Sequence, residues 1–291
     1  MSELDLQSVP GLRWMENGQS SFSGPVRALY AKLDALFLRW ASECDAEEHQ
    51  YPPMLPAREL GRLDYFRSFP HLATFACSLS TAPENLKAFA SGPGVRDDGG
   101  LAVTELAPIE SVLTPAACYH VYVELQGSKL DAARHVTLRC PCFRREAYYA
   151  PLRRQRSFGM REIVCLGTAD EVKGFLTRYR ERVERFFVSV DLPIAWTAAT
   201  DPFFNGAANP KFFAQKIDPV KTEMVFGGDL AIGSVNFHKN FFGETFDISR
   251  DGAAAFSGCV AFGLERWVYA VVSRWGTDPK GWPDFASGSD S

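Results

Sequence analysis

The sequence predicts an α+β fold in which helices flank a mostly antiparallel β-sheet. Apolar residues recur with helical period in long segments near both ends and in the middle of the chain, as in 22–41 and 170–187. Between them lie short segments with period-2 character, such as 135–143 and 158–167. With no internal repeat or linker, residues 1–284 are predicted to form a single domain, followed by a Gly/Ser/Asp tail, 285–291, predicted to be disordered.

The first predicted helix covers 22–41 and begins with Ser23 and Pro25, which suit a helix N-terminus. Its apolar face is formed by Val26, Leu29, Tyr30, Leu33, Phe37 and Trp40. A second helix is predicted over 56–68 and is stopped by Pro70.

From about 71 to 142 the chain changes to short segments rich in β-branched and aromatic residues, interrupted by the turn-rich stretch 91–100. The best predicted strands here are 117–125 and 135–143, and 158–167 is expected to form another.

The strongest helix is predicted over 170–187, with an apolar face formed by Val172, Phe175, Leu176, Tyr179, Val183, Phe186 and Phe187. Two strands are predicted over 221–228 and 229–238, and a final helix over about 263–274.

Composition excludes several classes of protein. The chain has 291 residues, a net charge of −4 and 46% hydrophobic residues, which excludes disordered, collagen-like and coiled-coil proteins and permits a core that needs no disulfide or metal. A protein that grips nucleic acid mainly through phosphate charge is disfavoured, because that mode needs a basic surface.

The N-terminus lacks the features of a signal peptide, and no apolar run approaches the length needed to cross a bilayer. A cytoplasmic location with reduced thiols is therefore expected. Most of the seven cysteines are predicted to be buried core residues. This includes the Cys140/Cys142 pair, because structural zinc sites usually use CxxC spacing.

Residues 139–162 contain seven arginines, namely Arg139, Arg144, Arg145, Arg153, Arg154, Arg156 and Arg161. A solvated loop could hold such a run. Here the arginines flank two predicted strands and their loop, which would gather several guanidinium groups over one site. Arg offers fixed bidentate donors to phosphate, so the cluster suits a nucleoside triphosphate.

Three segments resemble the motifs of class II aminoacyl-tRNA synthetases. The run FRRE (143–146), a loop, RQRSF (154–158) and Glu162 resemble motif 2, and SGCVAFGLERWVYAVV (257–272) resembles motif 3, with Arg266 three residues after its last glycine. Residues 51–72 are similar to the motif 1 helix with its proline, which implies a homodimer. All three occur in the order that the fold requires.

Only about 50 residues precede the motif 1 segment and about 20 follow the motif 3 helix, which leaves no room for a tRNA-binding arm. The whole chain instead resembles the truncated seryl-tRNA synthetase homologues called amino acid:[carrier protein] ligases. The resemblance rests on the stretches LPARELGRLDYFRSFPHL, LTPAACYHVY, MREIVCLGT, NFHKNFFGETFDI and SGCVAFGLERW. It implies activation of a small amino acid, with glycine or alanine preferred, and its transfer to the phosphopantetheine thiol of a carrier protein.

The resemblance also implies a catalytic zinc ion held by Cys118, Glu162 and Cys259. The spacing of the two cysteines alone would not single them out. Three protein ligands would leave a fourth position open for the α-amino group of the substrate, as is typical of catalytic zinc sites.

For ATP, bound with Mg²⁺, the resemblance implies a role for each motif residue. Arg144 would bridge the substrate carboxylate and the α-phosphate, Glu146 would accept a hydrogen bond from the adenine amine, and Phe158 would stack on the ring. The β- and γ-phosphates would be held by Arg154, Gln155 and Arg266. Lys221 (with Lys216 as a competing choice) and the stretch Ala231, Ile232, Gly233 and Ser234 complete the implied set.

Several interpretations stay open at this level. The basic face of 170–187, with Lys173, Arg178, Arg180, Arg182 and Arg185, is a candidate docking surface for an acidic carrier protein, or equally a solvated, ion-paired face. His238 is a candidate site residue, although a core or surface position is the default. An aminoacyl-tRNA synthetase core acting on tRNA, and a non-catalytic paralogue with a regulatory role, are the alternative functions.

Overall fold

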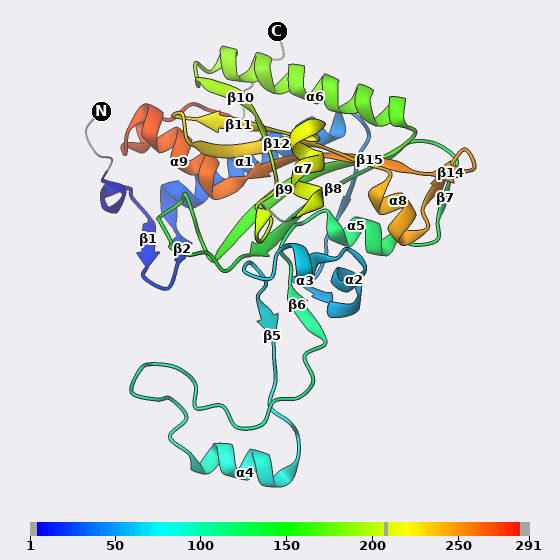
Figure 1. Ribbon diagram of the computed structural model, residues 1–291. Coiled ribbons are helices and arrows are strands. Elements are labelled where there is room, and N and C mark those ends of the chain that lie inside the picture. Colours follow the sequence, from blue (N-terminus) through cyan, green and yellow to red (C-terminus); the bar gives the residue numbers. More distant parts are fainter. Residues whose placement is uncertain (1–4, 207–208, 286–291) are drawn as a thin grey trace.

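The computed structural model describes residues 5–206 and 209–285, and its central feature is a twisted sheet whose strands follow the order β10-β11-β12-β15-β9-β8-β3 (Figure 1). All neighbours in this sheet are antiparallel except β3 and β8, which are parallel. The mostly antiparallel α+β fold predicted from the sequence is therefore confirmed.

The sheet and the smaller strand pairs have the following bounds: β1 (Leu12–Met15), β2 (Gln19–Phe22), β3 (Glu47–His49), β4 (Met54–Pro56), β5 (Phe75–Ala76), β6 (Ser111–Leu113), β7 (Lys129–Leu130), β8 (Arg134–Phe143), β9 (Ser157–Gly167), β10 (Ile194–Ala199), β11 (Lys221–Phe226), β12 (Leu230–Lys239), β13 (Ser249–Arg250), β14 (Ala253–Ala254) and β15 (Phe256–Gly263). The helices are α1 (Gly24–Ser42), α2 (Ala57–Arg62), α3 (Tyr65–Ser68), α4 (Pro83–Ser91), α5 (Tyr119–Glu124), α6 (Ala169–Ser189), α7 (Pro210–Ile217), α8 (Phe241–Phe246) and α9 (Leu264–Trp275), with short 3-10 turns at Leu6–Ser8 and Pro279–Gly281.

Each face of the sheet carries its own core. Helices α1, α6 and α9 pack on one face, against residues such as Ile163 and Val260. Helices α2, α3, α5 and α8 contribute to the core on the other face, which includes Val164, Cys259 and Ala261. Because side chains alternate along a strand, Phe158, Met160 and Glu162 of β9 share this second face.

Local sequence signals explain the long helices. The hydroxyl of Thr168 accepts from the Glu171 amide while the Glu171 carboxylate accepts from the Thr168 amide, a complete capping box at the start of α6. Pro25 lies in the first turn of α1. The predicted helices over 22–41, 170–187 and 263–274 and the predicted strands over 135–143, 158–167 and 221–238 are confirmed within a few residues.

Two local predictions are wrong, and several elements, including α4, α7, α8 and β10, are not predicted from the sequence. The strand expected over 117–125 is instead helix α5, which buries the consecutive residues His120, Val121 and Tyr122, whereas a half-buried strand buries every second residue. The single helix expected over 56–68 is divided into α2 and α3 at Asp64, whose φ of 56° is left-handed. Helix α4 was not expected, although Pro83 in its first turn is a helix-start signal.

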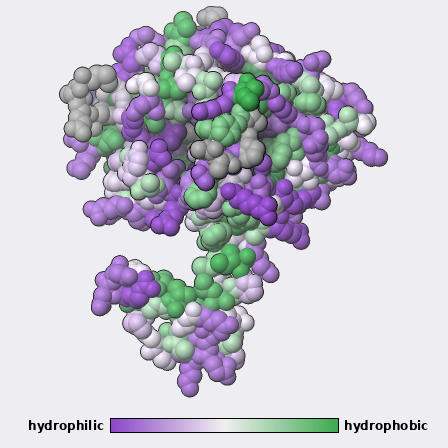
Figure 2. Space-filling model, viewed as in Figure 1, coloured by the Kyte–Doolittle hydropathy of each residue, from purple (hydrophilic) through white to green (hydrophobic). Residues whose placement is uncertain are grey.

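Residues between β5 and β6, including α4, form an arm that extends away from the body (Figure 1). Figure 2 shows hydrophobic residues gathered on this arm and its stem. Its exposed large apolar side chains are Phe75, Leu86, Val95, Leu101, Val103, Leu106 and Ile109.

Phe285, the first residue of the predicted tail, is buried against Phe186, and 286–291 lie outside the described residues.

In the described part of the chain, no helix is both long and apolar enough to cross a bilayer.

Candidate active site

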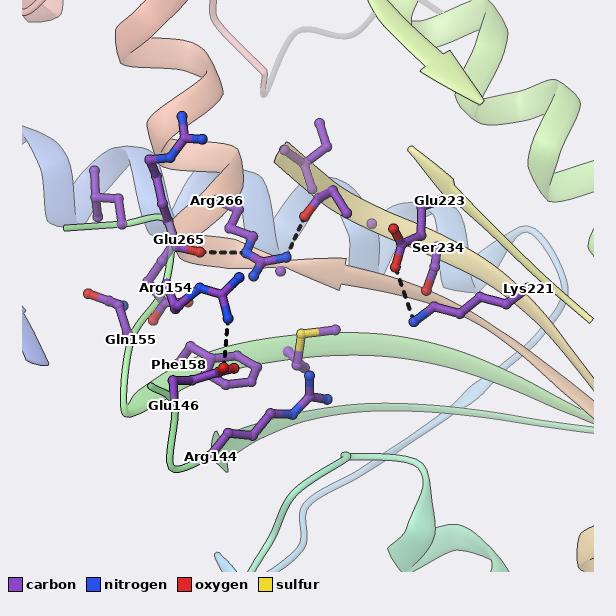
Figure 3. A pocket seen from close by; sticks show the side chains of 17 residues that line it. Arg144, Glu146, Arg154, Gln155, Phe158, Lys221, Glu223, Ser234, Glu265 and Arg266 are labelled. Atoms are coloured by element: carbon purple, nitrogen blue, oxygen red, sulfur yellow. Dashed lines mark hydrogen bonds and ion pairs between the residues drawn. The ribbon is translucent and has the colours of Figure 1, made fainter. Parts of the chain in front are cut away.

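Two adjoining pockets lie over the sheet face that carries Glu162 and Cys259. The arginine pocket contains Arg144, Arg154 and Arg266, and Figure 3 shows these three side chains together with Glu146 and Phe158. The thiol pocket contains Cys118, Glu162 and Cys259.

Arg266 is anchored by two backbone carbonyls. Its Nε donates to the Arg153 carbonyl at 2.8 Å and its Nη1 to the Ala231 carbonyl at 2.7 Å. Burial, together with the like charges of Arg144 and Arg154, lowers the pKa of Arg266 to about 10. The carboxylates of Glu146 and Glu223 offset part of the charge of the cationic side chains that line the pocket, and the remaining positive charge favours an anionic ligand.

Glu146 and Phe158, to which the resemblance gives the adenine-binding role, both line the arginine pocket. The guanidinium of Arg144 lies 5.3 Å from the centre of the Phe158 ring, and its Nε donates to the Pro115 carbonyl. Glu146 accepts from Arg154 Nη1 at 2.7 Å. This contact uses one oxygen of Glu146 and one nitrogen of Arg154, which leaves the second carboxylate oxygen and further guanidinium N–H groups for other partners.

Gln155 is buried and its side-chain oxygen accepts from the Ser20 hydroxyl of β2. The adjoining residues Ala231, Ile232, Gly233 and Ser234 line the same pocket. Glycine is needed at 233, because a Cβ there would lie 2.7 Å from both the Ala261 carbonyl oxygen and the Met224 sulfur.

Lys221, rather than Lys216, reaches the site. It lines both pockets, and its Nζ lies 3.1 Å from the Glu223 carboxylate and 3.4 Å from that of Asp201. Lys216 is exposed at the end of α7, over the ring of Phe212, and lines neither pocket.

Sequence reasoning included Arg153 only in the arginine cluster and missed several other residues of the arginine pocket, namely Leu152, Met160, Glu223, Gly263 and Glu265. Both carboxylate oxygens of Glu265 lie within 3.0 Å of the Gly159 amide nitrogen, which donates to them. Burial raises the pKa of Glu265 to about 7. Its position next to Arg266, in the segment that resembles motif 3, was the available signal.

The structure brings Cys118, Glu162 and Cys259 together although the two cysteines are far apart in the sequence. Cys118 lies at the N-cap position of α5, Glu162 lies in the middle of β9, and Cys259 pairs with Val164 across β15 and β9. One ligand atom from each lies within 4.8 Å of the others, and all three residues are at most 5% exposed.

The chemistry of these donors fits a cation. Burial raises the pKa of Glu162, and the hydrogen bond to Cys259 together with burial raises the pKa of Cys118 well above its usual range. Glu162 Oε2 is buried and has no hydrogen-bond partner among the described residues. Thiolate sulfur and carboxylate oxygen are donors that zinc accepts, and a metal ion would compensate their charge.

Two more residues of β12 face this cluster. Asn236 Nδ2 donates to Cys259 Sγ at 3.3 Å, and His238 Nε2 lies 3.8 Å from the same sulfur. Burial lowers the pKa of His238 to about 4, so the ring is neutral near pH 7. Positions 236 and 238 lie on the same face of the strand as Ser234, because side chains two residues apart share a face. This period of two could have placed both residues at the site.

The two pockets meet at four residues that line both of them: Arg144, Met160, Lys221 and Ser234. A molecule held in the thiol pocket can therefore contact one held in the arginine pocket, beside two cationic side chains.

The basic face of α6 lies across the sheet from both pockets, because α6 packs on the face that carries Ile163 and Val260. Arg180 pairs with Glu184, and Arg182 pairs with Glu43 at 2.9 Å. These contacts favour the solvated, ion-paired interpretation. Cys140 and Cys142 are fully buried in the core under the thiol pocket, in agreement with the packing interpretation.

Comparison with curated proteins identifies relatives in the family that the sequence motifs resemble. The chain is 34% identical over 249 residues to amino acid–[acyl-carrier-protein] ligase 1 of Bradyrhizobium diazoefficiens, covering 83% of this chain and 75% of the relative. Ligase 2 of the same organism is 33% identical over 83% of this chain and 73% of that protein. The type-2 serine–tRNA ligase of Methanopyrus kandleri is 25% identical, over 92% of this chain but 55% of the relative. No family model matches the chain.

Solved structures agree on the fold. The M. kandleri seryl-tRNA synthetase in complex with an A. aeolicus tRNA superimposes with a TM-score of 0.79 at 19% identity. The prolyl-tRNA synthetase of Giardia lamblia in complex with prolyl-adenylate gives 0.67 at 13% identity. These matches cover 96% and 91% of this chain, which spans 57% and 50% of the two solved chains. The chain belongs to the amino acid–[acyl-carrier-protein] ligases, a family of enzymes with the catalytic fold of class II aminoacyl-tRNA synthetases.

Proposed function

We propose that the protein activates a small amino acid with ATP, forming an aminoacyl-adenylate, and transfers it to the phosphopantetheine thiol of a carrier protein. The observation that carries this proposal is the junction of the two pockets at Arg144, Met160, Lys221 and Ser234. A carboxylate of an amino acid bound in the thiol pocket would meet the α-phosphate of ATP bound in the arginine pocket.

In the first step a carboxylate oxygen forms a bond to the α-phosphorus, and the bond to pyrophosphate breaks. No general base is needed, because the nucleophile is already an anion. Arg144 is proposed to lie between the carboxylate and the α-phosphate and to reduce their repulsion. Arg154, Gln155 and Arg266 are proposed to hold the β- and γ-phosphates, whose charge is further offset by the Mg²⁺ that ATP carries. Positioning and electrostatic stabilisation then account for most of the catalysis.

Glu146 and Phe158 are proposed to bind the adenine by a hydrogen bond to its amine and by stacking. The Glu146–Arg154 contact is compatible with this, because it uses only Oε2 of the carboxylate and Nη1 of the guanidinium. Lys221 and the 231–234 stretch complete the wall of the ATP site in this proposal.

Cys118, Glu162 and Cys259 are proposed to hold a zinc ion, which supplies a Lewis acid with an open position for the substrate α-amino group. Support comes from the thiol and carboxylate donors and from Glu162 Oε2, which has no hydrogen-bond partner among residues 5–206 and 209–285. Arg144, which lines both pockets, would meet the carboxylate of the same substrate. Glycine or alanine is the preferred substrate, supported only by family resemblance.

In the second step the phosphopantetheine sulfur bonds to the adenylate carbonyl carbon, the bond to AMP breaks, and the thiol proton passes to solvent. A carrier protein rather than tRNA is proposed as acceptor. The higher identity to the carrier-protein ligases and the net charge of −4 support this choice. A cytoplasmic location is also proposed, since thiol ligands must stay reduced.

The decisive test is amino-acid-dependent ATP–pyrophosphate exchange, scanned over the twenty amino acids on protein whose zinc content is known. Exchange with a small amino acid is expected, followed by a thioester on phosphopantetheinylated carrier but not on the unmodified carrier. Absence of exchange with every amino acid would leave only the non-catalytic alternative. Charging of bulk tRNA in place of the carrier would make the protein a tRNA synthetase.

A homodimer is proposed as well, with residues 51–72 at the interface, in line with their resemblance to motif 1. Light scattering coupled to size exclusion is expected to give twice the chain mass of 32.3 kDa. A monomer at micromolar concentration would contradict this.

A further inference from the structure

The two sulfur atoms of the thiol pocket have different surroundings. Cys259 Sγ has two side-chain nitrogen donors close to it, Asn236 Nδ2 at 3.3 Å and His238 Nε2 at 3.8 Å. For Cys118, no side-chain N–H donor is found among residues 5–206 and 209–285. The pocket is therefore built asymmetrically around Cys259.

The ring of His238 is itself held by two buried hydroxyl groups. Its Nδ1 lies 3.0 Å from the Tyr122 hydroxyl and 3.3 Å from the Ser257 hydroxyl. Tyr122 and Ser257 are at most 1% exposed, and the Phe242 ring packs edge-on against the imidazole at 5.1 Å. The histidine thus has one well-defined orientation.

That orientation determines which ring nitrogen carries the hydrogen. A thiolate can only accept hydrogen bonds, so a neutral imidazole that faces a thiolate presents Nε2–H to the sulfur and leaves Nδ1 as the acceptor. The hydroxyl groups of Tyr122 and Ser257 both lie within reach of Nδ1, and the Tyr122 hydroxyl, at 3.0 Å, can donate to it, so the contacts of the ring are consistent with this tautomer. Asn236 is fixed in a similar way, because its Nδ2 also lies 3.0 Å from the Ser234 hydroxyl.

We propose that His238 and Asn236 are positioning residues that stabilise Cys259 as a thiolate, which makes Cys259 the more firmly held of the two sulfur ligands. This inference rests on the proposed zinc site and adds to it an outer layer of residues. Groups that donate to metal ligands commonly change metal affinity by about 10- to 100-fold when they are removed.

The test is zinc retention in competition with a chelator. His238→Phe keeps an aromatic ring but removes the donor, and Asn236→Leu keeps the approximate volume of the amide. Each is expected to weaken zinc retention by about tenfold, at the lower end of the usual range. His238→Gln, whose amide can place an N–H near the sulfur, is expected to recover most of the loss.

His120→Phe is the matched control. His120 is also buried on this side of the sheet, but its Nε2 contacts Thr114 at 2.9 Å and its ring stacks on Tyr51, and neither of these partners is a proposed ligand. The control is expected to keep wild-type zinc retention, and thermal melting of each variant separates metal loss from unfolding. The sulfur-to-metal charge-transfer absorption of the cobalt-substituted protein gives a second readout, which should shift in His238→Phe and stay unchanged in His120→Phe.

The outcomes separate this inference from the proposed function. If the wild-type protein binds zinc but His238→Phe and Asn236→Leu retain it equally well, the inference is wrong and the zinc site stands. If both variants lose zinc no more than His120→Phe does, the loss reflects general packing and the inference is also wrong. A wild-type protein that binds neither zinc nor cobalt overturns the proposed metal site, and the inference with it.

Discussion

The arginine pocket and the thiol pocket share one face of the sheet but are encoded differently. Most residues of the arginine pocket come from three short stretches, 144–160, 221–234 and 263–266. The thiol pocket joins single residues from α5, β9 and β15, with its two cysteines at positions 118 and 259. Residues that lie close together in the sequence form a motif that can be recognised there. A site built from isolated residues can be recognised only in the folded structure.

The pockets also differ in charge. Several cations surround the arginine pocket and favour a polyanion, whereas the donors of the thiol pocket are acids whose burial favours their protonated forms. The first is suited to bind ATP directly. The second is suited to bind a cation, and metal binding there would release protons.

The largest expected effect comes from Cys259→Ala, which should abolish metal binding in the thiol pocket and leave nucleotide binding in the arginine pocket unchanged. Loss of a ligand is expected to remove zinc and reduce amino-acid-dependent exchange to background, while ATP affinity stays within about threefold because the arginine pocket is intact. Metal analysis, exchange and calorimetric ATP binding measure the three quantities. Cys77→Ala, at an exposed cysteine of the arm, is the control. Full activity in zinc-free Cys259→Ala would refute the metal assignment.

Arg144→Ala should slow the reaction between the molecules bound in the two pockets. Because Arg144 lines both of them, we expect exchange to fall on the order of 10²- to 10³-fold, the usual cost of removing a charge-stabilising donor from a transition state. Zinc content should not change. Arg145→Ala, at the exposed neighbouring residue, should behave as wild type, and an equal loss in both variants would contradict the proposed role of Arg144.

A smaller effect confined to the arginine pocket is expected for Glu146→Ala. Loss of a hydrogen bond that involves a charged group costs about 1.5–3 kcal/mol, so the KM for ATP should rise about 10- to 100-fold while the KM for the amino acid stays unchanged. Steady-state exchange at varied ATP and amino acid concentrations tests this. Glu146→Gln should retain part of the ATP affinity, because its amide oxygen can still accept. An increase confined to the amino acid KM would place Glu146 in the other pocket.

Glu265 and Glu162 are buried glutamates, one in each pocket, but the main partner of Glu265 is a backbone amide. The Glu265 pKa rises from about 4.5 to about 7 on folding, so the folded state holds the proton more tightly than the unfolded state. Its contribution to the free energy of unfolding is therefore largest below pH 4.5 and declines as the pH rises to about 7. Glu265→Gln, which cannot ionise, should gain stability relative to wild type at pH 8 by up to about 3 kcal/mol.

Urea unfolding at pH 5 and pH 8 measures this difference, which should be much smaller at pH 5. Glu59→Gln is the control, because Glu59 is buried but paired with Arg58 and Arg62, and its loss should bring no such gain at pH 8. A Glu265→Gln effect that is equal at both pH values would show that the side chain does not titrate in this range.

The smallest effect is expected for charge reversal at Arg178 and Arg185, which are exposed on α6. Because α6 lies across the sheet from both pockets, carrier loading should change less than about twofold at low salt, where surface electrostatics are strongest. Carrier thioester formation measures this, with pyrophosphate exchange as the control reaction. A large loss of loading without loss of exchange would restore α6 as the docking surface.

Much of the fold was predictable because the signals are local. The capping box of Thr168 and Glu171, the apolar period of α1 and the alternation of β9 are complete within one element each. The segment 117–125 misled prediction because its β-branched and aromatic residues suit a strand, yet tertiary packing buries three of them consecutively in α5. The turn at Asp64 likewise depends on how α2 and α3 pack.

The sequence by itself determined strands β8, β9, β11 and β12 of the sheet, its long helices, the arginine-rich stretch and, through resemblance, part of the residues of both pockets. Only the tertiary structure decided that Cys118, Glu162 and Cys259 meet, that Lys221 rather than Lys216 lines the pockets, and that Asn236 and His238 face one sulfur and not the other. The physical reason is that secondary structure follows from the periodicity of neighbouring residues, whereas these contacts depend on the register between strands that are distant in the chain.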